Sequence, residues 1–188
     1  MVAIGGASGS VYAQRLLDTL AAMSARDPKA LEVGLCVSSA GAEVWNHEIG
    51  DFPAYPFTRY GLRDFRAPFA SGSAGWDAMV VVPCSTGGLA RIAHGISENL
   101  IERAADVMLK EQRRLIIVPR ETPMSLPQLR NMVRCAQAGA MILPAMPAFY
   151  QQPKTLDDLA DFMAGKILSA LGFEHELFPP WTGKAGPD

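Results

Sequence analysis

The sequence has few of the residues that build metal sites and disulfides. Its 188 residues include three cysteines and three histidines, scattered without a CxxC pair or an HExxH motif. An odd number of widely spaced cysteines argues against a disulfide framework, and the common structural zinc spacings are missing. We therefore expect a protein without a bound metal, in a reducing compartment, the cytoplasm.

Charge is also scarce, and neither sign dominates. Lys and Arg number 17, Asp and Glu number 19, and the formal net charge is −2. Charged residues make up 19% of the chain, against about 25% in an average soluble domain. The basic stripe of a charge-driven nucleic-acid binder is missing. Because 49% of the residues are hydrophobic, we expect apolar surface beyond the chain's own core, and hence contacts between subunits.

No apolar run is long enough to predict a membrane span. The longest, residues 139–150, is interrupted by Pro144 and Pro147 and falls short of the roughly 20 residues that a spanning helix needs. The first residues have no basic segment and no cleavage site of a signal peptide. We therefore expect no association with a membrane.

Short apolar runs alternate with helical patterns, as in a parallel sheet covered by helices. The predicted strands are residues 2–4, 31–37, 78–82, 115–118 and 140–143. The predicted helices are 11–23, 40–48, 88–94, 98–110, 125–137 and a last helix from a capping box at Thr155 and Asp158 to Gly172. Residues 49–77 contain prolines and no clear period, so we expect a long loop there. We expect one domain over residues 1–172, and a proline-rich tail over 173–188 that wraps a neighbour or frays.

Small, hydroxyl and charged residues follow all five predicted strands. These segments are 5–10, 38–39, 83–88, 119–122 and 144–150. Ligands of such sheets bind beyond the carboxyl ends of the strands, where backbone N–H groups and helix N-termini attract anions. The sequence therefore predicts a ligand crevice at this edge.

The first of these turns differs from a dinucleotide-binding turn. Its glycines stand at positions 5, 6 and 9 instead of forming GxGxxG, and the second strand ends in serines instead of an acidic residue. The Walker lysine pattern is also missing. These differences disfavour a dinucleotide and NTP hydrolysis, and they leave a mononucleotide open.

The helix predicted at 98–110 has a polar face and an apolar face. Its polar face carries Asn99, Arg103, Asp106 and Lys110. Taken alone, these residues are typical of a solvated face with ordinary ion pairs. Taken with Arg120 and Glu121 after the fourth strand, they indicate a cationic pocket beside a carboxylate. Such a pocket suits a phosphate or pyrophosphate leaving group, with Glu121 handling a proton.

Several motifs together resemble the UbiX-like flavin prenyltransferase family. They are Gly6-Ala7-Ser8-Gly9, Ala70-Ser71-Gly72-Ser73, Pro83-Cys84-Ser85-Thr86, the block 99–123 and Pro147-Ala148-Phe149-Tyr150. The similarity covers residues 3–172. It implies a Rossmann-like, three-layer α/β flavoprotein with a mostly parallel sheet, assembled as a dodecamer with its active site near subunit contacts.

The resemblance also implies the reaction. The family joins a dimethylallyl group, usually from dimethylallyl monophosphate, to N5 and C6 of reduced FMN without a metal. The product, prenylated FMN, serves UbiD-like decarboxylases.

The resemblance implies three sets of site residues. Those implied in catalysis are Ser8, Glu48, Lys110 and Glu121. Those implied in binding FMN are Gly6, Ala7, Ser8, Ser38, Ser85, Thr86, Arg103 and Arg120. Those implied in binding the prenyl phosphate are Phe65, Ser71, Gly72, Lys110, Arg120, Tyr150 and Lys166.

Two residues depart from the family pattern. Phe65 stands where members commonly have tryptophan, which is the best aromatic partner for a cation. Lys166 stands where members often have arginine, so the charge is kept but bidentate geometry is lost. Both changes bear on rate or substrate preference more than on the class of reaction.

Two alternative functions stay open at this stage. One is an FMN-dependent decarboxylase of a peptidyl or pantothenoyl cysteine, which uses an Asn-bearing loop and a catalytic His near the first helix. Here the corresponding loop, 84–88, has no Asn and the helix 11–23 has no His. The other is an FMN-binding protein of the same fold without prenyl transfer, which Phe65 and Lys166 motivate.

Overall fold

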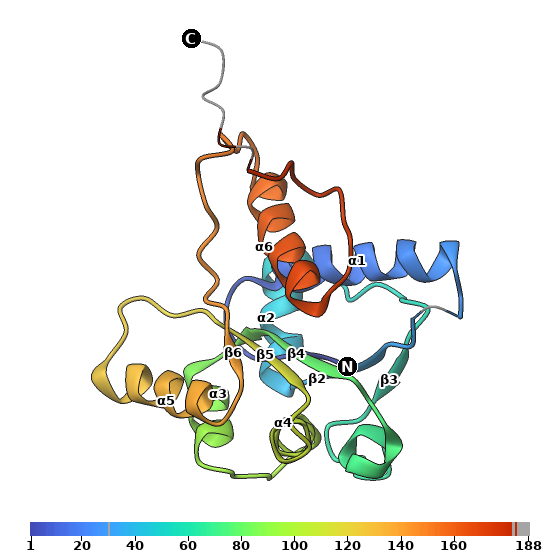
Figure 1. Cartoon of the computed structure of the whole chain (residues 1–188), viewed down its shortest axis with the longest axis vertical. Coiled ribbons are helices and arrows are strands. Elements are labelled where there is room, and N and C mark those ends of the chain that lie inside the picture. The colour runs from blue at the N-terminus through green and yellow to red at the C-terminus, as the bar shows by residue number, and fades with distance from the viewer. Residues whose placement is uncertain (30, 182, 184–188) are drawn as a thin grey trace.

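The protein folds around one sheet of six parallel strands (Figure 1). The computed structural model describes residues 1–29, 31–181 and 183. The strands are β1 (Val2–Ile4), β2 (Gly34–Val37), β3 (Thr58–Tyr60), β4 (Ala78–Cys84), β5 (Arg114–Pro119) and β6 (Met141–Ile142). Their order is β3-β2-β1-β4-β5-β6, and every neighbouring pair is parallel. The predicted α/β fold is confirmed. All five predicted strands are present, β1 with the predicted ends and the other four with shifted ends.

Strand β3 corrects the prediction of a continuous loop over residues 49–77. It pairs with β2, with Gly34 opposite Thr58, at the edge of the sheet. Two of its three residues are exposed, so it carries no alternating apolar pattern that the sequence would reveal. The same segment also forms two 3-10 turns, η1 (Pro68–Ala70) and η2 (Gly72–Ala74).

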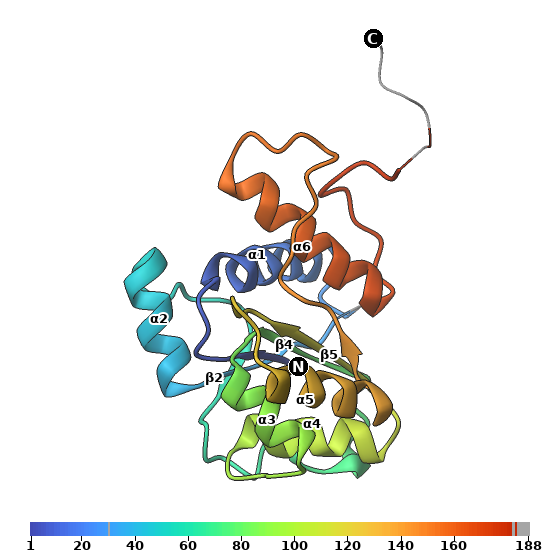
Figure 2. The same ribbon diagram turned by 90° about the vertical axis from the view of Figure 1, so that its left-hand side faces the viewer.

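Helices cover both faces of the sheet, as Figure 2 shows from the side. One face carries α1 (Ser10–Arg26), α2 (Ser39–Ile49) and α6 (Leu156–Leu171), and the other carries α3 (Thr86–Ala93), α4 (Leu100–Lys110) and α5 (Leu126–Gln137). Successive strand residues point to opposite faces. Accordingly, Val80 and Val82 pack against the α1 and α6 side, whereas Val81 packs against the α3 and α4 side.

The strand order reverses between β1 and β4, which is where this class of fold binds its ligands. The loops after these strands lie close together, because Gly5 N–H donates to the Pro83 carbonyl at 3.0 Å. A side chain at position 6 would not fit, since a Cβ on Gly6 would stand 2.5 Å from that of Ala40. The sequence therefore packs three loops tightly at the predicted crevice.

Side-chain caps start the helices that surround this edge. Ser38 caps α2, Ser85 caps α3 and Asn99 caps α4, each by accepting a backbone N–H bond from the first turn. The predicted capping box of Thr155 and Asp158 is also present at α6. These caps fix the directions of the helices relative to the strand ends.

The described part of the tail folds back over α1 and α6. Phe173, Leu177 and Phe178 pack against the apolar cluster of that face, and Phe178 stacks on Phe162 with ring centroids 5.1 Å apart. The remainder, residues 182 and 184–188, lies outside the described residues. The domain boundary at residue 172 stays a prediction. None of the helices described combines the length and apolar character of a membrane span.

Candidate active site

The turn between β1 and α1 binds a carboxylate of the protein itself. Gly9 has a left-handed φ of 109°, which glycine adopts without strain, and it caps α1. Its N–H contacts both carboxylate oxygens of Glu48, at 3.1 and 3.0 Å, and Ser10 N–H donates to Oε2 at 2.8 Å. The anion at this helix N-terminus is therefore Glu48, from the last turn of α2.

Hydrogen bonding favours the ionised form of Glu48. Partial burial raises the pKa of Glu48, but hydrogen bonds from the Ser8 side chain and from Ser10 and Gly9 outweigh burial and hold the pKa below its usual range. A carboxylate with a lowered pKa stabilises the fold above its ordinary pKa. This contribution is lost as the pH falls through the lowered value.

Glu48→Gln is expected to reduce the free energy of unfolding by about 1 kcal/mol near pH 7, because a neutral amide accepts weaker hydrogen bonds. The difference from the unsubstituted protein should be smaller near about pH 3, because the contribution is lost as the pH falls from the ordinary carboxyl pKa of about 4.3 through the lowered value. Urea denaturation at the two pH values measures it. Glu43→Gln, on the exposed side of α2, is the matched control. An equal loss at both pH values would contradict the electrostatic role.

Arg120 and Glu121 follow β5 and lie beside the same turn. Arg120 Nε donates to the Ser8 carbonyl at 3.1 Å, and its backbone N–H donates to the Cys84 carbonyl at 3.2 Å. The guanidinium is thereby fixed next to Ser8 and retains further N–H donors. Glu121 is half-buried, and its Oε1 accepts the Thr122 N–H at 3.0 Å. The structure thus places Ser8, Glu48, Arg120 and Glu121 at one edge of the sheet.

A cavity of about 240 Å³ opens between the carboxyl ends of β1, β2 and β4. Gly5, Gly6, Ser38 and Ser85 are among its walls. Both serine oxygens accept backbone N–H bonds, from Gly41 at 2.9 Å for Ser38 and from Gly88 at 3.2 Å for Ser85. Their hydroxyl protons stay available as donors. Of the residues predicted to bind FMN, Gly6, Ser38 and Ser85 lie here, and Ala7, Ser8 and Thr86 adjoin them in sequence.

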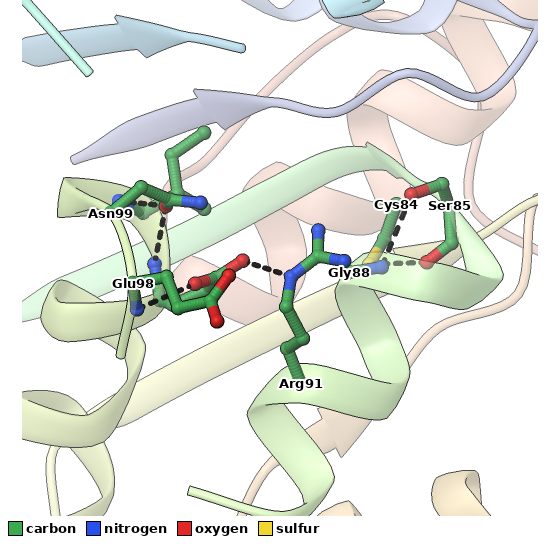
Figure 3. Close-up of polar contacts among 8 residues, drawn as sticks. Cys84, Ser85, Gly88, Arg91, Glu98 and Asn99 are labelled. Carbon is green, nitrogen blue, oxygen red and sulfur yellow. Dashed lines mark hydrogen bonds and ion pairs between the residues drawn. The ribbon is translucent and has the colours of Figure 1, made fainter. Parts of the chain in front are cut away.

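Two residues that the sequence analysis does not single out also line this cavity. Arg91 extends from α3 between the Ser85–Gly88 turn and the segment of Glu98 and Asn99 (Figure 3). Its Nε pairs with the carboxylate of Glu102, which is buried in the first turn of α4. Glu102 stands three residues after the cap Asn99, the spacing of a capping box, and this spacing was the available signal. Nothing in the sequence marks Arg91 as its partner.

A second group of predicted residues lies along α4. Arg103 donates to the Ala70 carbonyl at 3.1 Å and to Asp106 at 2.9 Å, and Lys110 pairs with Glu111. The Gly72 carbonyl accepts from Arg113 Nη2 at 2.7 Å. The loop that carries Ser71 and Gly72 is therefore attached to α4. Within one chain the cations on the polar face of α4 form ordinary ion pairs, and the predicted cationic pocket with Arg120 and Glu121 is not assembled.

This second group is remote from the first within one chain. Asn99 and Glu102, at the start of α4, line the cavity, whereas Lys110 ends the helix, roughly 15 Å further along its axis. Lys110 precedes β5, whereas Arg120 follows it. The two cations therefore lie at opposite ends of the parallel strands. Among the described residues, the recorded hydrogen bonds of Arg103, Lys110 and Arg120 do not link the two groups.

The three remaining predicted residues are exposed and dispersed. Phe65 is 49% exposed in the loop before η1. Tyr150 precedes α6 and packs edge-on against Phe162 and Trp181, with centroids 6.1 and 5.3 Å apart. Lys166 lies on α6, one turn after Phe162. A single chain does not gather the predicted prenyl-phosphate residues into one pocket.

The cysteines and acidic residues supply no other reactive centre in the described part of the chain. Cys36, Cys84 and Cys135 are free and buried. Burial raises the pKa of Cys84 to about 12, so its thiol stays protonated beside the cavity. Within residues 1–29, 31–181 and 183, no three His, Cys, Asp or Glu side chains gather as a metal site.

The sheet order and the crevice at its switch point are those of a Rossmann-like fold, and a family model described as Flavoprotein matches residues 1–170. Flavin prenyltransferase UbiX of Halalkalibacterium halodurans is 45% identical, over 96% of this chain and 91% of its own length. The chain belongs to the UbiX-like flavin prenyltransferase family.

Two solved structures agree with this assignment. AnUbiX (PadA1), in complex with FMN and dimethylallyl pyrophosphate, has a TM-score of 0.89 and 36% identity, covering 98% of this chain and 97% of that one. A dodecameric FMN-dependent UbiX-like decarboxylase from Escherichia coli O157:H7 has a TM-score of 0.89 and 35% identity, covering 97% and 98%. Membership of this family goes against the alternative of a cysteine decarboxylase.

Proposed function

We propose that this protein transfers a dimethylallyl group from dimethylallyl phosphate to N5 and C6 of reduced FMN. The observation that carries the proposal is the fixed Arg120 guanidinium beside Ser8 and the ionised Glu48, at the same carboxyl ends of the strands as a hydroxyl-lined cavity. The family relationship and the complex of AnUbiX with FMN and dimethylallyl pyrophosphate support the choice of both substrates.

The residues around the cavity fit FMN. At about 240 Å³ the cavity takes part of a ligand, since whole drug-sized ligands fill roughly 300–1,000 Å³. Ser38 and Ser85 offer hydroxyl donors inside, and Gly6 leaves the backbone accessible. Reduced FMN supplies the electron-rich ring positions that receive the prenyl group. FMN held by these residues would have Ser8 and Arg120 nearby, at the ends of β1 and β5.

The protein's own residues act on the leaving group and on protons. Departure of phosphate from an allylic carbon builds negative charge on oxygen, which charge-assisted N–H donors stabilise. Arg120 is the cation that donates to the Ser8 carbonyl, and Lys110, Lys166 and Tyr150 are the other donors we assign to the phosphate. Glu121, half-buried beside Arg120, receives a proton late in the reaction, and Ser8 relays one.

Neighbouring subunits complete this site. Lys110 and the Ser71–Gly72 loop lie at the opposite end of the parallel strands from Arg120, so one chain alone does not assemble the phosphate grip. We propose a homo-oligomer, a dodecamer, in which α4 of one subunit reaches the Arg120 edge of another. The dodecameric relative supports this arrangement.

Exposed apolar side chains supply the contact surface. On α5, Leu126, Leu129 and Val133 are 57%, 46% and 54% exposed, and their spacing places them on one face of the helix. Tyr150 and Phe149 are 52% and 70% exposed before α6. Covering these faces accounts for the high apolar content of the chain.

Phe65→Trp is expected to raise the rate of prenyl transfer about twofold to fivefold, because tryptophan stabilises a nearby cation more strongly than phenylalanine does. The rate at saturating dimethylallyl phosphate measures the effect. Phe65→Leu, which removes the aromatic face, is expected to lower the rate. A rate that is the same with Trp, Phe and Leu would contradict a role for Phe65 beside the allylic cation.

The proposal is tested by measuring release of phosphate from the monophosphate, or of pyrophosphate from the diphosphate, under anaerobic conditions. The protein is mixed with dimethylallyl monophosphate or diphosphate, with reduced FMN, oxidised FMN or no flavin. We expect release that requires reduced FMN, with faster turnover of the monophosphate. Release without flavin would identify a phosphatase, and no release from either donor would refute prenyl transfer.

The chemistry of the product indicates which class of enzyme uses it next. Prenylated FMN is a cofactor for decarboxylation, and we propose a UbiD-like decarboxylase as its recipient.

Three free, buried cysteines are in keeping with a reducing compartment, and we propose the cytoplasm as the protein's place of action.

A further inference from the structure

An ion pair between a buried carboxylate and a half-buried guanidinium forms one wall of the cavity. Glu102 is 3% exposed, and its carboxylate accepts the Glu98 N–H at 2.9 Å while it pairs with Arg91 Nε. A carboxylate removed from water needs such partners, because an unpaired buried charge is strongly unfavourable. Glu102 therefore fixes where the Arg91 guanidinium lies.

Arg91 has donors left over after this pairing. In the described part of the chain, neither Nη1 nor Nη2 has a hydrogen-bond partner, and the side chain is 41% exposed. It lines the same cavity as Ser38, Ser85 and Asn99, and Figure 3 shows it between Ser85 and Asn99. A guanidinium anchored at Nε presents its two terminal nitrogens as a planar fork, which matches the oxygens of a phosphate.

The usual anion position of such folds is already filled. Glu48 takes the Gly9 and Ser10 N–H groups at the start of α1, so a second anion there would meet a like charge. The cavity at the ends of β2 and β4 instead offers the hydroxyls of Ser38 and Ser85 together with Arg91. An anionic ligand group is favoured in the cavity for this reason.

We propose that Arg91, positioned by Glu102, binds the 5′-phosphate of FMN and makes the protein select FMN over riboflavin. The inference rests on the proposed function, since it takes FMN as the prenyl acceptor. Arg91 touches the ligand, whereas Glu102 acts through Arg91. The pair is neutral overall, so the preference comes from the two directed Nη hydrogen bonds instead of from net charge.

The test measures the dissociation constants of oxidised FMN and riboflavin by flavin fluorescence. The main variant is Arg91→Met/Glu102→Gln, because it removes both charges and leaves no buried carboxylate unpaired. It is expected to weaken FMN binding by about tenfold to hundredfold, the range of charged hydrogen bonds, while riboflavin binding changes by less than about twofold. Glu102→Gln alone is expected to reduce the FMN preference by a smaller factor, because Arg91 loses its anchor.

A matched control is Arg15→Met/Asp161→Asn, which removes an ion pair between α1 and α6 outside the cavity. It is expected to leave the ratio of the two dissociation constants unchanged. Equal weakening of FMN and riboflavin in the Arg91 variant would show a merely structural pair and overturn the inference. If the unsubstituted protein prenylates reduced FMN but binds riboflavin as tightly as FMN, the inference is overturned and the proposed function stands. Failure to bind either flavin overturns the proposed function with it.

Discussion

Arg120→Ala is expected to lower the rate of prenyl transfer by about 10²- to 10³-fold, the effect of removing one donor from a site of developing negative charge. Arg120 is fixed by its bonds to Ser8 and Cys84, so the charge it offers is already in position before the substrate binds. The effect should fall mainly on kcat, because the interaction strengthens as phosphate departs.

Two controls separate this chemistry from folding. Arg120→Lys keeps a cation and is expected to recover part of the rate, although it loses the Nε bond to the Ser8 carbonyl. Arg26→Ala removes an exposed arginine in the last turn of α1 and is expected to have no effect on the rate. If Arg120→Ala is largely unfolded at the assay temperature, so that loss of folded protein accounts for the loss of rate, Arg120 has a structural role instead.

Lys110→Ala is expected to reduce prenyl transfer about as strongly, and yet a mixture of two inactive variants should regain activity. If Lys110 of one subunit serves the site that contains Arg120 of another, random assembly of Lys110→Ala and Arg120→Ala chains restores about a quarter of the sites. The chains are mixed, dissociated, reassembled and assayed for phosphate release. Each variant reassembled alone is the control.

A site built from one chain predicts a different result for the mixture. If both residues served a site within one chain, every site in the mixture would lack one of them and no activity would return. The position of Lys110 at the far end of α4 from the cavity makes the shared site the expected result.

The parts of the fold that follow from local physical chemistry were predictable from the sequence. Strands β1, β4 and β5 are continuous apolar runs, and the caps of α2, α4 and α6 follow from side chains that accept N–H bonds. Strand β3 was not predictable, because Thr58 and Arg59 are exposed and pairing with β2 alone makes them a strand.

The candidate site also has features that were predictable from the sequence and features that were not. Glycines and serines after the strands indicated a crevice, since backbone groups meet there whatever the details of packing. The partner of Glu48 was not visible in the sequence, because its bonds to Gly9 and Ser10 depend on how α2 lies beside α1. The pair Arg91 and Glu102 likewise depends on the packing of α3 against α4.

The mass of the flavin after one anaerobic turnover tests the central claim most directly. Protein, reduced FMN and dimethylallyl monophosphate are combined, the protein is removed, and the flavin is analysed by mass spectrometry. We predict a flavin heavier by one five-carbon prenyl unit, formed with the unsubstituted protein and strongly reduced with Arg120→Ala. Recovery of unmodified FMN alone, with protein that binds FMN and is given either the monophosphate or the diphosphate, would contradict it.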